Sequence, residues 1–276
     1  DLDMLCNNIL DVSSIEFCNN IVNYTQDKNS ASIEIGNLDT TTGDFCGNRI
    51  HLDSDKYNVS IGYDAGSISQ YIDAIAIGRG AGYRDQSENA ISIGYKAGYE
   101  YQSRNAIAIG LKAGYQDQSQ NAIAMGKDAG NQNQSQNAIA MGEAAGQTSQ
   151  NESAIAIGLR AGNTSQNEFS ISIGQEAGQI QQKKNSIAIG NNAGRNNQGE
   201  NSIAIGQYAG YDQSSNSIIL NAQTDISLNS DTSGLFIAPI REDASGSNIL
   251  VYDLTSKEIK YSENPVLSSL TITGNL

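Results

Sequence analysis

The sequence predicts an all-β fold, a parallel β-solenoid of ten 16-residue coils over residues 57–216. Three observations carry this prediction. A glycine preceded by isoleucine or methionine recurs every sixteen residues from Gly62 to Gly206. An alanine-glycine pair ends four places after each of these glycines, and glutamine follows eight places after them in nine of the ten copies. A fixed period without insertions is typical of stacked repeats, in which each unit lies directly over the last.

Residues 1–56 precede the repeat, and we expect them to form an N-terminal β cap or adaptor. Segments 14–18 and 32–36 alternate apolar and polar residues, as half-buried strands do. The terminal units of a solenoid are usually atypical because they cover an open end. Cys6, Cys18 and Cys46 all lie here, without the spacing of a zinc site. We favour three reduced thiols over one disulfide and a free thiol.

Each repeat contains a short strand whose side chains alternate between two faces, as in residues 89–94. Since large aliphatic side chains normally lie inside, we expect the isoleucine face to form the core of the coil. This core ladder comprises Ile75, Ile77, Ile91, Ile93, Ile107, Ile109, Ile123, Met125, Ile139, Met141, Ile155 and Ile157. The opposite face carries almost entirely alanine or serine, and we expect it to contact a sister chain. This inter-chain face comprises Ala90, Ser92, Ala106, Ala108, Ala122 and Ala124.

Polar columns also recur at the same height in successive coils. The repeated glutamine predicts an amide ladder, in which each side chain bonds to the copies above and below it. Its members are Gln86, Gln102, Gln118, Gln134, Gln150 and Gln166. An asparagine five places before the glycine predicts a similar ladder at a turn. Tyr83, Tyr99 and Tyr115 form another column, for which we favour a solvated aromatic stripe over a sugar-binding platform.

Residues 217–276 are predicted to form a C-terminal β region in which the repeat ends. The repeated phrase returns one residue early, without its glycine, at residues 217–221. Segments 235–240 and 248–252 have the composition of strands, and residues 252–261 resemble a hairpin with a polar turn. Residues 267–274 are expected to begin a further strand.

The composition excludes several classes of function. A formal net charge of −14 argues against a nucleic-acid partner or an anionic membrane surface, and no apolar run is long enough to span a membrane. His51 is the one histidine, and the glycines form no phosphate-binding loop. We therefore expect no enzymatic activity, no cofactor and no metal site. An ice-binding solenoid is a minor alternative, disfavoured because threonine is scarce in the repeat.

The phrases at residues 105–110 and 201–206, Asn-Ala-Ile-Ala-Ile-Gly and Asn-Ser-Ile-Ala-Ile-Gly, resemble the head repeat of YadA-type trimeric autotransporter adhesins. The resemblance covers residues 57–216. It implies a left-handed parallel β-roll, three chains around one axis, and exposure on a surface for attachment. The 16-residue period is longer than the usual repeat of that family. Residues 234–241 and the hairpin after them resemble segments of large-virus structural proteins and phage tail fibres.

The expected function is therefore a structural fibre or adhesin-like rod that mediates attachment from a virion surface or an extracellular surface appendage. The alternative is a passive spacer or capsid-decorating protein that binds no receptor. The expected partners are two further copies of the chain, in a homotrimer, and a host-surface receptor or glycan.

Overall fold

The computed structural model describes residues 14–17, 20–26, 31–38, 45–53, 56–240 and 249–262. Every regular element in these residues is a β-strand. No helix long and apolar enough to cross a membrane occurs among them. The chain divides into two compact units, Asp1–Pro239 and Ile240–Leu276, which are described separately below.

The first unit is organised around a sixteen-stranded sheet, here called the wall sheet. Its first five strands are β1 (Ser14–Phe17), β2 (Asn20–Gln26), β3 (Ala31–Leu38), β4 (Phe45–Asp53) and β5 (Asn58–Ile61). It continues through β7 (Ile75–Ile77), β9 (Ile91–Ile93), β11 (Ile107–Ile109), β13 (Ile123–Met125), β15 (Ile139–Met141), β17 (Ile155–Ile157), β19 (Ile171–Ile173), β20 (Ile187–Ile189), β22 (Ile203–Ile205), β24 (Ser217–Asn221) and β26 (Gly234–Ala238).

A second row of strands forms the other side of the coils. Seven of them make one sheet: β6 (Ile68–Gln70), β8 (Arg84–Gln86), β10 (Glu100–Gln102), β12 (Gln116–Gln118), β14 (Gln132–Gln134), β16 (Thr148–Gln150) and β18 (Thr164–Gln166). Ile180 then makes single parallel bridges to Thr164 and Asn196. Beyond it lies a three-stranded sheet of β21 (Asn196–Gln198), β23 (Ala209–Gln213) and β25 (Leu228–Ser230).

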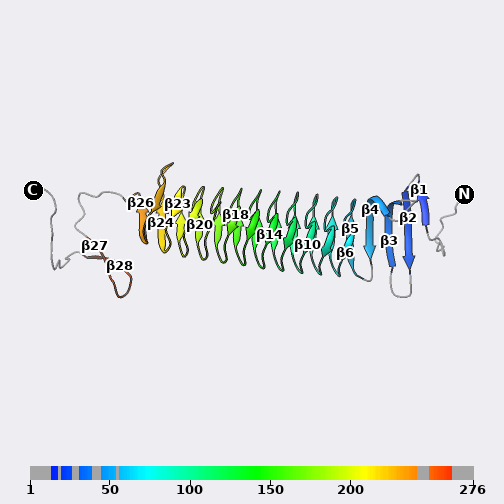
Figure 1. Ribbon diagram of the computed structural model, residues 1–276, viewed down its shortest axis with the longest axis horizontal. Helices are drawn as coiled ribbons and strands as arrows, with labels where there is room; N and C mark the ends of the chain where they lie inside the picture. Colours follow the sequence, from blue (N-terminus) through cyan, green and yellow to red (C-terminus); the bar gives the residue numbers. More distant parts are fainter. Residues whose placement is uncertain are drawn as a thin grey trace, which may run out of the picture. The chain divides into compact units, whose positions relative to one another are not determined.

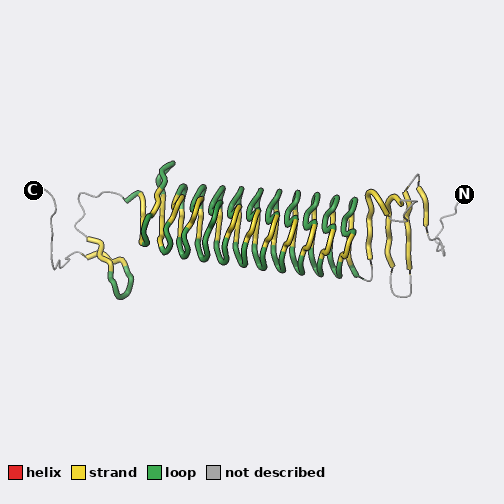
Figure 2. The backbone as a smooth tube through the Cα atoms, viewed as in Figure 1, coloured by secondary structure: helices red, strands yellow, loops and turns green. Residues whose placement is uncertain are grey.

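The strands from β5 to β26 pair in parallel, each with the strand one coil away (Figure 1). The register is that of the repeat, so that Ile107 pairs with Ile123 and Ala108 with Ala124. Figure 2 shows how short strands alternate with turns along each coil. The result is a parallel β-solenoid of about eleven turns, more than the ten expected, because β24 and β26 continue the stack after the repeat ends.

Two positions in each coil require glycine because a Cβ atom there would be too close to neighbouring atoms. Gly110 has a φ of 129°, and a Cβ placed on it would lie 2.6 Å from the carbonyl oxygen of Gly126 in the next coil. Gly114 has a φ of 51°, and a Cβ there would lie 2.7 Å from Oε1 of Gln118 inside the coil. The first glycine therefore permits backbone stacking, and the second leaves space for the buried glutamine.

The interior of the coils is the reverse of the expected one. Ala108, Ala124 and the equivalent alanines and serines are fully buried, while the isoleucines on either side of them point outward. The reason is the width of the coil: the side chain of Gln118 in β12 reaches the main-chain oxygen of Ile107 at 2.8 Å. An interior that one glutamine crosses has room only for small side chains beside it.

Two sets of expected residues are corrected by this finding. The expected core ladder lies on the outer face, half-buried or exposed: Ile75, Ile77, Ile91, Ile93, Ile107, Ile109, Ile123, Met125, Ile139, Met141, Ile155 and Ile157. The expected inter-chain face lies inside the coil, at zero exposure: Ala90, Ser92, Ala106, Ala108, Ala122 and Ala124.

The two ends of the solenoid differ in construction. At the N-terminal end β1 to β5 pair in antiparallel fashion, with β4 against β5. At the C-terminal end the position that holds Ala204 is taken by Ile219 and then by Phe236. Ile219 is fully buried, and Leu228 and Phe236 pack against its cluster. Larger side chains thus fill the interior where the last coils close.

In the second unit β27 (Ile249–Tyr252) and β28 (Ile259–Ser262) form the antiparallel hairpin expected near residues 252–261. The strand expected at residues 267–274 and the thiols of Cys6 and Cys18 lie outside the described residues. So do the side chains of Cys46 and His51, although their main chain belongs to β4.

Candidate interaction surfaces

A continuous ladder of buried glutamines runs through the interior of the coils. Nε2 of Gln102 donates to Oε1 of Gln118 at 3.1 Å and to the main-chain oxygens of Ile91 and Ala106 at 2.9 and 3.2 Å. Oε1 of Gln102 accepts from Nε2 of Gln86 and, at 2.7 Å, from Oγ of Ser92. Every polar atom of this amide therefore has a partner, which a buried amide requires.

The bonds to the next glutamine and to two main-chain oxygens recur at every member of the expected ladder, and the ladder extends beyond those members. The serine bond is present only in coils that carry a serine at the position of Ser92. The glutamine-to-glutamine bonds connect Gln70, Gln86, Gln102, Gln118, Gln134, Gln150, Gln166, Gln182, Gln198 and Gln213. Gln213 was missed by sequence reasoning because its coil is one residue shorter than the others. Allowing a one-residue deletion after Gly206 brings Gln213 into the glutamine column, so the signal was present.

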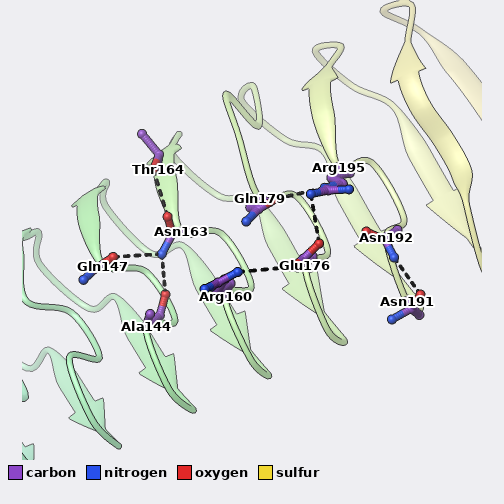
Figure 3. Close-up of polar contacts among 10 residues, drawn as sticks. All are labelled: Ala144, Gln147, Arg160, Asn163, Thr164, Glu176, Gln179, Asn191, Asn192 and Arg195. Carbon is purple, nitrogen blue, oxygen red and sulfur yellow. Dashed lines mark hydrogen bonds and ion pairs between the residues drawn. The ribbon is translucent and has the colours of Figure 1, made fainter.

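Outside the coil, the amide and ionic contacts also link residues about sixteen apart. Nδ2 of Asn105 donates to Oδ1 of Asn121 at 3.1 Å, and Asn121 repeats this contact with Asn137. Figure 3 shows the equivalent links at a row of corner turns, where Glu176 lies between Arg160 at 3.5 Å and Arg195 at 3.1 Å. Each such contact joins a coil to its neighbour.

The exposed side of the wall sheet carries the second candidate surface, here called the outer apolar stripe. It consists of two parallel columns of aliphatic side chains, one and three places before each repeated glycine. The more exposed column comprises Ile61, Ile77, Ile93, Ile109, Met125, Met141, Ile157, Ile173, Ile189 and Ile205. Beyond the repeat it is continued by Leu220 and Ile237, and on the N-terminal side by Ile50.

The exposure of this stripe is nearly constant along the solenoid. Ile93 is 36% exposed, Ile157 37% and Ile205 40%. Scattered apolar residues are common on protein surfaces, but a continuous row across successive strands exceeds what a monomer normally exposes. The outer apolar stripe, and not the buried alanine and serine columns, is therefore the apolar surface that the described coils leave exposed.

The geometry defines a β-solenoid whose coils are joined by an internal amide ladder and which presents one apolar face outward. Comparison of the sequence with known protein families gives a match for this repeat. Residues 182–193 and 198–209 match the YadA head domain repeat, in two copies. The matched coils are thus similar to the YadA head repeat, and the β-solenoid fold fits a repeat of that kind.

The phrase quoted above at residues 201–206 lies within the second matched copy, while residues 105–110 lie outside both copies. No curated protein and no solved structure gives a significant match to the chain. The resemblance of the C-terminal region to virus and phage proteins therefore stays a prediction.

Proposed function

We propose that this chain is the subunit of an attachment fibre, in which three copies associate through the outer apolar stripe. The observation that carries the proposal is the continuous stripe of half-exposed aliphatic side chains along the wall sheet. Covering one such side chain stabilises an assembly by about 1 kcal/mol, since it is only partly exposed to begin with. Repeated over the length of the solenoid, this contribution is large enough to drive association.

The proposed number of copies, three, is that of the adhesins whose head repeat the coils resemble. YadA-like adhesins are trimeric, and their head repeats build extracellular surface appendages. Three wall sheets facing one axis would remove all three stripes from water. The fibre would then present its turns and its second row of strands to the surroundings. A location on a cell or virion surface fits the acidic composition, since a net charge of −14 suits a soluble, self-repelling appendage.

Sedimentation velocity over a range of concentrations tests the assembly. The expected mass is about three times the 29.3 kDa of one chain. The variant Ile157→Glu/Ile173→Glu places two charges on the outer apolar stripe and is expected to sediment as a single chain. The matched variant Gln120→Glu/Gln136→Glu adds the same charge at exposed positions away from the stripe and should remain assembled. A single-chain mass for the unaltered protein at all concentrations would overturn the proposal.

Attachment is tested separately, with the assembled protein on cultured cells and on a glycan array. Saturable binding is expected. An assembled fibre that binds no cell and no glycan would favour the alternative, a passive spacer or decorating protein.

A further inference from the structure

Three consecutive coils carry a cluster of tyrosines and cations at their corner turns that no other part of the described chain repeats. We call it the aromatic–basic ridge. It consists of Arg79, Tyr83, Lys96, Tyr99, Lys112 and Tyr115. These residues lie one to five places after the glycines that begin the coils, whereas the outer apolar stripe precedes those glycines. The ridge and the stripe therefore belong to different columns of the solenoid.

The tyrosines of the ridge are stacked along the direction in which the coils repeat. The ring centroids of Tyr83 and Tyr99 are 4.8 Å apart, and those of Tyr99 and Tyr115 are 5.1 Å apart with an interplanar angle of 1°. Nζ of Lys96 lies 4.6 Å from the Tyr99 centroid and 6.0 Å from that of Tyr115. Since the rings cover one another's faces, the stack offers a row of phenol edges and hydroxyl groups.

Gly80 provides the space for this arrangement. In the next coils the same position holds Lys96 and Lys112. A Cβ on Gly80 would lie 3.3 Å from Cε2 of Tyr99 and 3.4 Å from Cγ of Lys96. The absence of that Cβ lets Lys96 lie back over the tyrosine stack.

The cations of the ridge have no carboxylate partner among the described residues, unlike those of the neighbouring turns. Further along the same corners, Lys127 pairs with Glu143 at 2.8 Å and Arg160 with Glu176 at 3.5 Å. Arg79 instead lies 4.4 Å from the ring of Tyr95, and the ammonium groups of Lys96 and Lys112 lie 4.6 and 5.9 Å from the rings of Tyr99 and Tyr115. Three positive charges in a row thus stay unneutralised on a chain whose net charge is −14.

The ridge also has defined ends. In the column of Gly80, Lys96 and Lys112, the coil before the ridge carries Asp64 and the coil after the ridge carries Asp128. In the tyrosine column the flanking residues are Ser67 and Asn131. A long polyanion would meet acidic residues beyond either end, so the ridge fits a short anion that extends over about three coils.

We propose that the aromatic–basic ridge binds a short anionic oligosaccharide, with its carboxylate or sulfate groups on Arg79, Lys96 and Lys112 and its hydroxyl groups on the tyrosine hydroxyls. Charge complementarity selects an anion, and the row of phenol groups selects a ligand rich in hydroxyl groups over a bare phosphate chain. This inference rests on the proposed attachment function and names its ligand class, but it does not depend on three-chain association.

Isothermal titration calorimetry on the full chain tests the inference with four probes. These are a heparin-derived hexasaccharide, α2,8-linked trisialic acid, neutral chitotriose and a ten-nucleotide single-stranded DNA. Saturable binding is expected for the sulfated or the carboxylated oligosaccharide, and none for chitotriose. Which of the two anionic probes binds distinguishes sulfate from carboxylate recognition.

The variant Lys96→Gln/Lys112→Gln is expected to weaken that binding at least about tenfold, because the two charges that face the ligand are lost. The matched control Lys127→Gln/Lys184→Gln removes the same charge from lysines that pair with Glu143 and Glu168. It should change affinity less than about twofold, since exposed paired charges outside the ridge contribute little. Circular dichroism and sedimentation verify that both variants keep the fold and mass of the parent.

The inference is overturned by four results: no saturable binding of either anionic oligosaccharide, equal weakening by both variants, DNA binding at least as tight as the oligosaccharide, or a changed mass for Lys96→Gln/Lys112→Gln. The last result would make the ridge a contact between chains. Titration of Ile157→Glu/Ile173→Glu separates the two proposals, because a single chain that still binds the oligosaccharide retains the ridge without the assembly.

Discussion

At the scale of single residues, the buried glutamines explain why so thin an interior is stable. Each amide links three elements: its own strand, the main chain of the wall sheet and the glutamines of the adjacent coils. In a low-dielectric interior such bonds are strong, and a missing partner is costly. The ladder therefore makes each coil depend on its neighbours.

Replacement of Gln134 by leucine tests this dependence. The substitution keeps the approximate volume but leaves Nε2 of Gln118 and Oε1 of Gln150 each without one partner. We expect the free energy of unfolding to fall by about 2–4 kcal/mol. Gln132→Leu, on the exposed side of the same strand, is the control and should change it by less than about 0.5 kcal/mol. Equal values from urea unfolding would contradict the role given to the ladder.

Asp253 makes the hairpin of the second unit sensitive to acid. Its carboxylate accepts from the main-chain nitrogens of Ser256 at 3.1 Å and Thr255 at 2.8 Å, and from Lys260 at 3.1 Å. These bonds lower the pKa of Asp253 from 3.8 to about 2. A lowered pKa in the folded state contributes stability above the unfolded value, and this contribution is lost as the pH falls through the folded value.

We therefore expect the turn contacts to be complete above about pH 4 and to be lost between that pH and about pH 2. Amide chemical shifts of Thr255 and Ser256 should follow one titration with a midpoint near the Asp253 pKa. Asp253→Asn should remove that step from the pH profile. A midpoint near the ordinary value in the unaltered chain would show that the turn does not hold the carboxylate.

At the scale of strands, the sequence correctly predicts that large and small side chains alternate between two faces. It wrongly predicts which of these faces lies inside the coil. The period of two divides Ile107 and Ile109 from Ala108, and the structure keeps that division. Which face lies inside depends on the distance across the coil, and the buried amide of Gln118 sets that distance. The usual rule that large aliphatic residues lie inside fails here because the two rows of strands approach too closely.

Other features of the fold differ in the same way. Those repeated in every coil can be predicted from the sequence, and those that depend on which strands pair cannot. The glycine spacing and the amide columns are visible in the sequence because every coil repeats them. The replacement of Ala204 by Ile219 and Phe236 is not visible, since these residues take that position only through the pairing of β22, β24 and β26. The shift at Gln213 differs from these, because the one-residue shortening of its coil after Gly206 is visible in the sequence.

Overpacking of the interior distinguishes the two faces of a wall strand. Ala124→Leu adds a large side chain to a fully buried position beside Gln134, and we expect it to lower the unfolding free energy by about 3 kcal/mol or to prevent folding. Met125→Leu, the adjacent position on the outer apolar stripe, conserves volume at a 36% exposed site and should cost less than about 1.5 kcal/mol. Thermal unfolding of both variants is the measurement. A tolerated Ala124→Leu would mean that the interior is wider than described.

At the scale of the whole molecule, the outer apolar stripe makes oxidation a probe of assembly. Met125 and Met141 are 36% and 38% exposed in the single chain. If three stripes meet, both thioethers are shielded, and peroxide should convert them to sulfoxide several-fold more slowly than in the single-chain variant Ile157→Glu/Ile173→Glu. Peptide mass spectrometry measures both rates. Identical rates in the two proteins would place these methionines outside the contact.

The one-to-one contact of each coil with the next has a genetic consequence. Because the glutamine-to-glutamine bonds of the ladder connect residues about sixteen apart, a 48-nucleotide duplication or deletion in the coding sequence would restore the same contacts with a neighbour of the same kind. The length of the solenoid could then be increased or decreased by recombination between repeats, one strand spacing of about 4.8 Å at a time, without any new interface having to evolve.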